Sequence, residues 1–298
     1  MATIGRTCLF RHTLAIMTAV TDTVFRAPAP RLRRFVQSYV GYRMSGYAPG
    51  THIGMPSPYL TVIITIGDPL HMATASVPEQ DASDWPSLAS GISPVPCIIG
   101  HDGNQHGIQL ALTPLGARAL FGLPTAALGG WLIDLDDLLG PDAREIRDRV
   151  AGHDDWTARF AVLDQVFERR ADDYAMDPSL EHAWARLVGA GGRERVGTVA
   201  DEIGWSRRHL VNKFVAEFGV TPKDSARIAR FSASHDLLRR PEIPPLADVA
   251  VTCGYYDQAH MAREWRDLAG VPPSVWRARE VFAFVQGDEE ADGARSSA

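Results

Sequence analysis

The chain has 298 residues, of which 45% are hydrophobic and 22% are charged, and its formal net charge is −6. This length predicts two domains of ordinary globular composition. The acidic balance gives no sign of nucleic acid, although only a local face of a nucleic-acid-binding protein needs to be basic. No apolar run approaches 18 residues, so neither a membrane-spanning helix nor a membrane partner is expected.

The cysteines favour an intracellular protein without a disulfide framework. Cys8, Cys97 and Cys253 are far apart, odd in number and form no Cys-x-x-Cys pair. A cysteine zinc site is therefore not expected either, and a reducing cytoplasm fits best. Residues 1–22 are expected to be a disordered leader rather than a signal peptide, because Arg11 interrupts their apolar stretch.

The N-terminal region shows the pattern of a β-rich domain. Between residues 23 and 110, short apolar runs alternate with Pro and Gly. Residues 59–66 are the clearest strand, bounded by Pro58 and by a Gly-Asp-Pro turn. Two further strands are expected at 97–100 and 107–112. A short opening helix is expected at 31–39, and a long loop at 76–93.

The pattern then changes to helices. We expect helices over 114–121, 142–150 and 156–170. Acidic residues at the start of the second helix suit the helix dipole, and apolar residues recur at helical spacing in the third. Polar residues 171–178 form a linker, and residues 180–279 are predicted to be helical. The expected fold class is therefore α+β, with a β-rich, small barrel-like sensor domain that carries helices, followed by an all-α domain.

These patterns divide the chain into four parts. After the leader, residues 23–175 form a sensor, effector or dimerisation domain, and residues 176–282 form the helical domain. The last part, residues 283–298, is acidic and rich in small residues, and is expected to be a disordered tail.

An internal repeat in the helical domain is the most informative feature of the sequence. Residues 199–205 and 249–255 share the pattern Val-Ala-x-x-(Ile/Cys)-Gly-aromatic at an offset of 50. At an offset of 51, His209-Leu210 matches His260-Met261, Phe214 matches Trp265, and Gly219-Val220 matches Gly270-Val271. The extra residue falls just after the aromatic residue, where a turn can absorb it.

Each copy has what a helix-turn-helix unit needs. Gly204 and Gly254 stand where the chain must turn sharply, and glycine tolerates the positive φ required there. Ser206 and Asp257 can cap the following helix, which buries its apolar residues and points the others outward. The buried residues are expected to be Leu210 and Phe214 in the first copy, and Met261 and Trp265 in the second.

The outward faces of these helices carry side chains suited to reading DNA. Arg, Asn and Gln pair bidentately with base edges in the major groove. Between residues 193 and 279, 14 Lys and Arg stand against 11 Asp and Glu, a mild basic excess. The DNA-binding candidates are Ser206, Arg207, Arg208, Val211, Asn212 and Lys213 in the first copy, and Gln258, Ala259, His260, Arg263 and Arg266 in the second.

Residues 196–277 resemble the DNA-binding domain of the AraC/XylS family of transcription regulators. The matching residues are Val199-Ala200, Ile203-Gly204, Ser206 to Leu210, Phe214, Phe218-Gly219, Pro222, Asp248 to Ala250, Gly254-Tyr255, His260-Met261, Trp265 and Gly270 to Arg277. The resemblance implies that 176–282 is a DNA-binding domain with two helix-turn-helix units. It also implies a central helix at about 223–239, and recognition helices that enter successive major-groove segments on one face of the DNA.

The resemblance also implies which residues lie against the bases. They are Arg208, Val211 and Asn212 in the first recognition helix, and Gln258, Ala259, His260 and Arg263 in the second. Trp265 departs from the family's usual Phe, and Ala269 stands where an aromatic residue is common. Both substitutions are apolar, so they concern the packing rather than the fold.

Residues 31–170 resemble, more loosely, the sensor half of one subgroup of these regulators. The cues are residues 56–69, Gly100, 112–117, 120–124 and 134–140. Family sensor domains are commonly small β-barrels that bind a ligand, dimerise, or both.

Other kinds of site have less support. The β-rich region contains His52, His71, His101 and His106, but their spacing fits no fixed metal motif, so neither a metal nor a cofactor is expected. Some relatives carry a methyl-accepting cysteine, but the apolar neighbours of Cys97 favour a buried strand residue. No nucleophile elbow, phosphate-binding loop or dinucleotide fingerprint occurs, so no enzyme is expected.

The sequence thus predicts a sequence-specific transcription regulator, modulated by a small molecule or by dimerisation through its N-terminal domain. The expected partners are double-stranded DNA, a small-molecule effector, RNA polymerase and a second copy of the chain. The alternatives are a helical interaction module that has lost DNA binding, a plain helical bundle with a solvated charged face and, with less support, an N-terminal enzyme. A steep fall of DNA affinity with salt would separate a DNA-binding protein from an interaction module.

Overall fold

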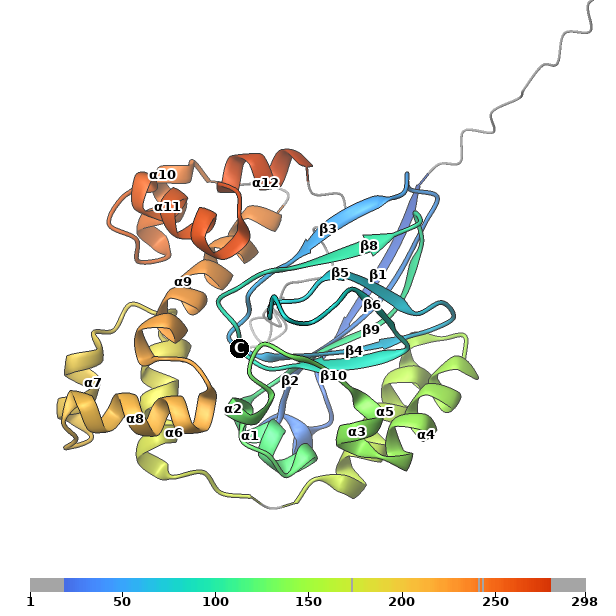
Figure 1. The fold of residues 1–298 in the computed structure, drawn as a ribbon, viewed down its shortest axis with the longest axis horizontal. Coiled ribbons are helices and arrows are strands. Elements are labelled where there is room, and N and C mark those ends of the chain that lie inside the picture. Colours follow the sequence, from blue (N-terminus) through green and yellow to red (C-terminus); the bar gives the residue numbers. More distant parts are fainter. Residues whose placement is uncertain (1–18, 173, 241, 243, 280–298) are drawn as a thin grey trace, which may run out of the picture.

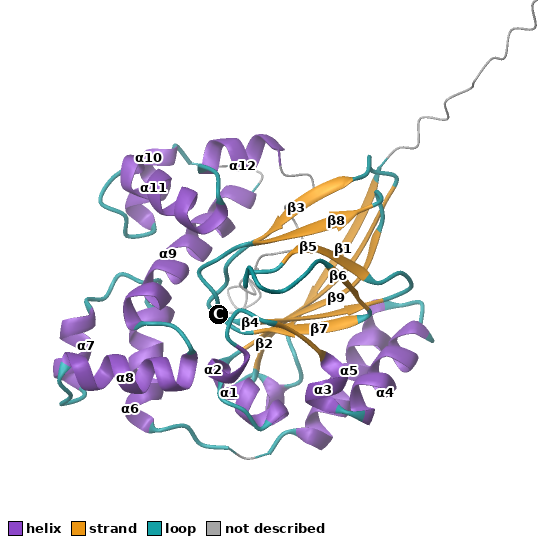
Figure 2. Ribbon diagram, viewed as in Figure 1, coloured by secondary structure: helices purple, strands orange, loops and turns teal. Residues whose placement is uncertain are grey.

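A computed structural model describes residues 19–172, 174–240, 242 and 244–279 of the chain. A β-rich N-terminal half with helices is followed by a C-terminal half built of helices (Figures 1 and 2). The predicted α+β fold class is therefore confirmed. Most of the expected leader, residues 1–18, and the expected tail lie outside the described residues. The first strand begins at Val20, within the last residues assigned to the leader.

Two antiparallel sheets face each other in the N-terminal half (Figure 2). The six-stranded sheet has the order β1-β2-β9-β4-β7-β10, and the four-stranded sheet has the order β3-β8-β5-β6. Their bounds are β1 Val20–Arg26, β2 Val36–Ser45, β3 Gly50–Gly54, β4 Leu60–Thr65, β5 Leu70–Thr74, β6 Ser83–Trp85, β7 Ser87–Ser90, β8 Cys97–His101, β9 Gln105–Leu112 and β10 Leu132–Asp134.

The larger sheet has a core on each of its faces. In β4, the buried Leu60, Val62 and Ile64 pack in the large core shared with the helices, whereas Ile63 packs in a separate core with residues of the smaller sheet. Side chains alternate between the faces of a strand. Because both faces of β4 find apolar partners, the sequence of the predicted strand at 59–66 is apolar almost throughout.

Two expectations for this half are wrong. The opening helix expected at 31–39 is a single 3₁₀ turn, Pro30–Leu32, followed by β2, which is paired with β1 on one side and with β9 on the other. Pairing with two neighbours outweighs the local apolar spacing that resembled a helix. The loop expected at 76–93 contains β6 and β7, and β7 is hydrogen-bonded between β4 and β10.

Helices pack against the larger sheet of the N-terminal half (Figure 1). They are α1 Pro114–Gly116, which continues as a π-helical turn Ala117–Phe121, then α2 Thr125–Leu128, α3 Leu135–Leu139, α4 Pro141–Ala151 and α5 Trp156–Arg170. The three helices predicted in this region are confirmed. In the core, the ring of Phe160 stacks on Tyr39 at 5.8 Å, and the Tyr39 hydroxyl donates to Asp164 at 3.1 Å.

The C-terminal half consists of two helical groups joined by the long helix α9 (Figure 1). Its helices are α6 Pro178–Trp184, continued by a π-helical turn Ala185–Gly189, then α7 Val196–Glu202, α8 Arg207–Phe218, α9 Pro222–Arg239, α10 Leu246–Thr252, α11 Gln258–Ala269 and α12 Pro273–Arg279. The central helix predicted at about 223–239 is α9.

The two halves contact each other near the end of α8. Arg118 donates to both carboxylate oxygens of Glu217, from Nε at 2.9 Å and from Nη2 at 2.7 Å. The Arg118 guanidinium also lies 5.2 Å from the centre of the Tyr174 ring. Beside this pair, a Cβ added at Gly219 would lie 3.0 Å from the backbone of Ala126. A bidentate, partly buried ion pair therefore joins the helices of the N-terminal half to the helical domain.

We expect Arg118→Ala to lower the free energy of unfolding by about 1–2 kcal/mol, because it leaves the Glu217 carboxylate largely buried without its partner. Only 11% of the Glu217 side chain is exposed. The matched control is Arg144→Ala, which removes an arginine that is 71% exposed and lies 3.7 Å from Asp136. That control should cost less than about 0.5 kcal/mol in urea unfolding. Equal losses in the two variants would contradict the role given to the Arg118–Glu217 pair.

Candidate DNA-binding site

The first helix-turn-helix unit is formed by α7 and α8. Between them the chain turns at Gly204, whose φ is +70°. The backbone amide of Trp205 donates to the carbonyl of Ala200 at 2.9 Å, which closes the end of α7. A left-handed residue at this point is the usual end of a helix and favours glycine.

The second unit, formed by α10 and α11, repeats this geometry. Gly254 has a φ of +80°, and the amide of Tyr255 donates to the carbonyl of Ala250 at 2.9 Å. The inserted residue of the second copy is Tyr256, which lies between this turn and α11 with 89% of its surface exposed. The sequence repeat is therefore a structural repeat.

Both recognition helices begin at the predicted caps. The Ser206 hydroxyl accepts from the amide of His209 at 3.2 Å, and the Asp257 carboxylate accepts from the amide of His260 at 2.6 Å. Each helix ends at a glycine with a positive φ, Gly219 or Gly270. The caps and the glycines satisfy backbone groups that a helix leaves unpaired at its ends. As a result, α8 and α11 both have 12 residues and begin and end at equivalent positions of the repeat.

The two turn glycines differ in their surroundings, which allows a matched test. A Cβ at Gly204 would meet nothing within 4 Å, whereas a Cβ at Gly254 would lie 2.6 Å from Cγ of Arg193. We expect Gly204→Ala to cost about 1 kcal/mol of stability from the left-handed backbone alone, and Gly254→Ala to cost more, about 2 kcal/mol, because Arg193 must also move. Thermal unfolding measures both. A Gly204→Ala variant as stable as the wild type would show that the turn does not need glycine.

The aromatic core of the first unit includes a residue that the sequence analysis missed. Leu210 and Phe214 of α8 are fully buried, as predicted. Trp184 of α6 stacks on Phe214 at 5.7 Å between ring centres and contacts Phe218 at 4.5 Å. Trp184 precedes the repeat, so the pattern that identified the other core residues could not find it.

The second unit explains the tryptophan at position 265. Its ring is fully buried, 4.7 Å from Phe231 and 5.5 Å from Trp276 between ring centres. Its indole nitrogen donates to the hydroxyl of Ser234 on α9 at 2.9 Å. A buried Trp needs such a partner, so the change from the family's usual Phe is accommodated by packing, as expected. Ala269 is also buried.

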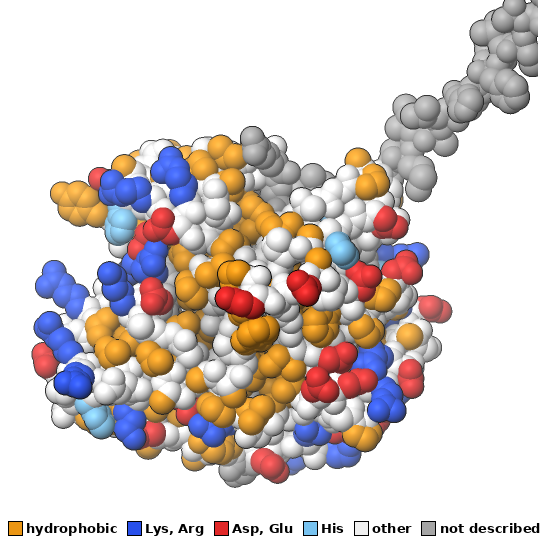
Figure 3. All heavy atoms as spheres, in the orientation of Figure 1, with side chains coloured by type: hydrophobic (Ala, Val, Ile, Leu, Met, Phe, Trp, Pro, Cys, Tyr) orange, Lys and Arg blue, Asp and Glu red, His pale blue; other side chains and the backbone are white. Residues whose placement is uncertain are grey.

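The cationic candidates on the two recognition helices are exposed to solvent. These candidates are Arg207, Arg208 and Lys213 on α8, and Arg263 and Arg266 on α11. Within the described part of the chain, none of the five forms an ion pair. Figure 3 shows Lys and Arg side chains gathered along the left edge of the molecule, over the two helix-turn-helix units. Ser206, Asn212, Gln258 and Ala259 are exposed as well.

Acidic residues of the helical domain are paired with other arginines. Glu202 accepts from Arg186 at 3.1 Å, and Glu264 accepts from Arg230 at 3.0 Å. Asp267 pairs with Arg227, and Glu217 with Arg118. Because these four carboxylates are already paired, they do not neutralise the cations of α8 and α11, which is how an acidic chain can carry a locally basic face.

Two candidates, Val211 and His260, are only partly exposed. Nδ1 of His260 accepts from the amide of Tyr256 at 3.2 Å, and its Nε2 lies 3.6 Å from Glu264. The imidazole is therefore held between the residue before α11 and a carboxylate one turn further along the helix. Arg263, one turn further along α11, is exposed by contrast.

Of the four histidines of the β-rich half, two lie near each other and two have separate surroundings. His71 pairs with Asp84, Nε2 of His106 contacts Arg159 at 3.0 Å, and the ring of His52 lies 6.0 Å from that of His101. Burial lowers the pKa of His52 and of His106 to about 4. In the described ranges, no three His, Cys, Asp or Glu side chains are grouped so that they could hold a metal ion.

Cys97 lies on β8, where its thiol donates to the carbonyl of Gly54 at 3.8 Å. Burial raises the pKa of this thiol to about 11. Because the thiolate is the nucleophilic form of cysteine, this raised pKa disfavours the reactive form at neutral pH. Cys97 is a strand residue, as its apolar neighbours predicted, but it is only partly buried.

The helical domain thus has two helix-turn-helix units joined by α9, and each unit presents exposed cations on its second helix. This arrangement is typical of proteins that bind DNA through paired helix-turn-helix units. Residues 199–279 match the family described as "Helix-turn-helix domain". No curated protein matches the chain. Among the helices of the described residues, none has the length and apolar character to cross a bilayer.

Solved structures show similarity to both halves of the chain. A variant of ToxT from Vibrio cholerae, in its apo form, is 12% identical, with a TM-score of 0.52 over 80% of this chain and 97% of that chain. A regulator with an AraC-type DNA-binding domain from Chromobacterium violaceum is 23% identical, with a TM-score of 0.30 over 34% of this chain and 90% of that chain. The DNA-binding domain of AdpA in complex with a target DNA is 22% identical, with a TM-score of 0.32 over 34% and 92%.

The similarity to ToxT concerns the fold and extends over both halves. Together with the match over the helix-turn-helix units, it confirms the predicted resemblance. The chain therefore contains, over residues 199–279, a helix-turn-helix domain that is similar to AraC-type DNA-binding domains.

Proposed function

We propose that the chain binds a specific DNA sequence through α8 and α11, and that the N-terminal half adjusts this binding in response to a small molecule. The observation that carries the first part is the equivalence of the two recognition helices. Each begins at a capped residue and exposes arginines, with Asn212 on α8 and Gln258 on α11 as further side chains able to read bases.

The proposed base-reading residues are those implied by the resemblance. Arg208 and Arg263 are the strongest candidates because the resemblance places both against the bases, and both are exposed without an ion pair in the described chain. Arg207, Lys213 and Arg266 are proposed to contact phosphates, which position the protein without reading sequence.

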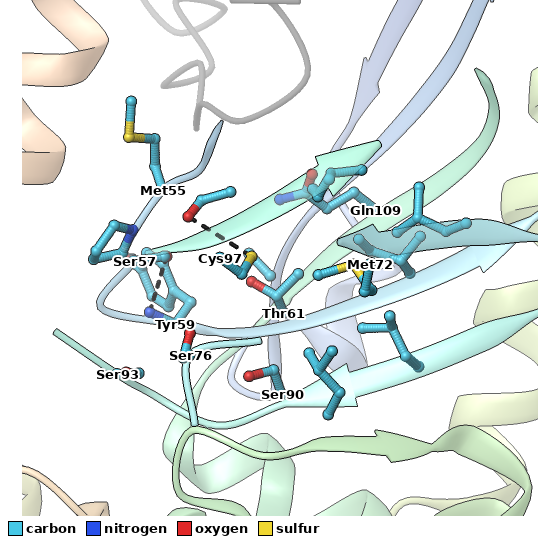
Figure 4. A pocket seen from close by; sticks show the side chains of 18 of the residues that line it. Met55, Ser57, Tyr59, Thr61, Met72, Ser76, Ser90, Ser93, Cys97 and Gln109 are labelled. Carbon is cyan, nitrogen blue, oxygen red and sulfur yellow. Dashed lines mark hydrogen bonds between the residues drawn. The ribbon is translucent and has the colours of Figure 1, made fainter. Parts of the chain in front are cut away.

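The small molecule is proposed to bind in a cavity between the two sheets (Figure 4). The cavity has a volume of about 100 Å³, and its wall includes Ser232 and His235 of α9, the helix that joins the two helix-turn-helix units. A ligand that binds one arrangement of the two halves more tightly shifts the population toward that arrangement. Contact with α9 would therefore couple the cavity to DNA binding.

Dimerisation through residues 23–175 and contact with RNA polymerase stay predictions of the resemblance. A cytoplasmic location belongs to the same proposal, because chromosomal DNA is the expected partner.

The test is the affinity of the full chain for its own upstream intergenic DNA and for a scrambled sequence, at two salt concentrations. We expect a preference of about a thousandfold, and an affinity that falls steeply with salt as counterions are released from neutralised phosphates. Salt-independent binding, or no binding to either DNA, would contradict the proposal. It would favour the alternative in which the helical domain is a protein-interaction module.

A further inference from the structure

The cavity between the sheets is lined by uncharged side chains. Among the described residues that line it, none is Asp, Glu, Lys or Arg. Its apolar wall includes Val40, Ile63, Met72, Leu88 and Ile99, and its polar groups are hydroxyls, amides and two histidines. A charge placed in such a site loses its hydration and gains no counter-charge.

The two histidines of the wall do not supply a charge. Burial lowers the pKa of His52 to about 4 and that of His235 to about 3, so both rings are neutral at neutral pH. Tyr42 supplies no charge either, because burial raises the pKa of its phenol. The site thus has no ionised group among its described residues with which to hold an anion or a cation.

Two polar side chains on neighbouring strands remain available to a ligand. Thr61 on β4 is paired with Ala111 on β9, and Gln109 lies two residues from Ala111 on the same face of the sheet. Both side chains belong to the cavity wall (Figure 4), and within the described chain neither makes a side-chain hydrogen bond. Each can donate and accept.

The serines near the mouth of the cavity are already engaged. Ser76 donates to the carbonyl of Val95 at 2.7 Å, Ser57 accepts from the amide of Tyr59 at 3.1 Å, and Ser93 accepts from the amide of Val95 at 3.0 Å. Hydrogen-bonding capacity is therefore left at Thr61 and Gln109, and Nε2 of Gln105 in the same wall is also buried without a hydrogen-bond partner in the described chain.

We propose that the effector is an uncharged, mainly apolar molecule with one hydroxyl or carbonyl group, which bonds to Thr61 and Gln109. A volume of about 100 Å³ has room for on the order of ten non-hydrogen atoms. This inference rests on the proposed function for the location of the effector site, and it adds the chemical class of the ligand.

The test compares three probes that differ only in their head group: octanol, octanoate and octylammonium. Isothermal titration calorimetry with the full chain at neutral pH should show saturable octanol binding. We expect octanol to bind on the order of a hundredfold more tightly than either ion, because each ion must lose its hydration. The measurement contains no DNA, so a failure of DNA binding would leave this result unchanged.

Two variants locate the probe. Ala111→Phe fills the cavity and should abolish octanol binding. Gln109→Lys places a cation in the wall, and should reverse the preference so that octanoate binds more tightly than octanol. Circular dichroism shows whether each variant is folded, and Gln109→Lys still locates the probe if Ala111→Phe does not fold.

Three results would overturn the proposal. The first is an equal or tighter affinity of the wild type for octanoate or octylammonium. The second is the absence of saturable octanol binding. The third is a folded Gln109→Lys variant with an unchanged preference for octanol, which would place the probe outside this cavity.

Discussion

Replacement of both Arg208 and Arg263 by alanine is expected to lower the affinity for the specific DNA site by roughly thirtyfold to twenty-five-thousandfold. Each arginine is exposed on its own recognition helix, and a bidentate contact with a base is worth about 1–3 kcal/mol. The two residues lie on the recognition helices of two separate units and have no ion-pair partner in common in the described chain, so their effects should add. Titration of the specific site and of a scrambled DNA, at one salt concentration, measures the change.

The comparison of the two DNAs decides what the arginines do. If they read bases, the affinity for scrambled DNA should change far less than the affinity for the specific site, and Arg144→Ala in the N-terminal half should change neither. Equal losses on both DNAs would contradict base reading and would make Arg208 and Arg263 phosphate contacts.

Trp265→Ala is expected to destabilise the second helix-turn-helix unit by about 3–5 kcal/mol, because it leaves a large cavity in a core that cannot collapse around it. The tryptophan is fully buried against Phe231 and Trp276. A loss of this size is a large part of the stability of a domain, so specific DNA binding should fall with it. Urea unfolding, followed by tryptophan fluorescence and by circular dichroism, measures the change.

Trp265→Phe is the matched control, because it retains an aromatic ring and removes the hydrogen bond to Ser234. We expect it to cost about 1–2 kcal/mol and to retain specific DNA binding. A Trp265→Ala variant that unfolds at the same urea concentration as the Phe variant would contradict the central position of this ring in the second unit.

The helical domain could be predicted from the sequence because its signals are local. Gly204 and Gly254 fix the turns through their own backbone conformation, and Ser206 and Asp257 cap helices that begin at the next residue. Two copies of the same local pattern reinforce each other. The inserted Tyr256 is absorbed before α11, so the buried positions of the two units remain equivalent.

The β-rich half was predicted less well because strand pairing joins distant parts of the chain. A helix is expected from the sequence at 31–39, but residues from Val36 onward form β2 because both neighbours in the sheet hydrogen-bond to this strand. The short strands β6 and β7 lie in a stretch whose Ser, Asp and Pro content suggests a loop. Only the pairing with β4, β5 and β10 reveals them.

The candidate site shows the same division. The repeat locates the recognition helices, so the arginines and the lysine on α8 and α11 could be named from the sequence. The ion pairs between nearby carboxylates and other arginines could not be predicted from the repeat. Arg118 and Glu217 are 99 residues apart in sequence, and Glu264 is buried on a recognition helix because Arg227 and Arg230 of α9 reach it. Contacts of this kind depend on the arrangement of whole elements.

The most direct test of the central claim is a hydroxyl-radical footprint of the full chain on its specific DNA site. Two recognition helices that read successive major-groove segments should protect two regions on one face of the DNA, separated by about one helical turn. Arg208→Ala should weaken protection of one region and Arg263→Ala protection of the other. A single protected region, or two regions that both variants weaken equally, would contradict recognition by two equivalent helix-turn-helix units.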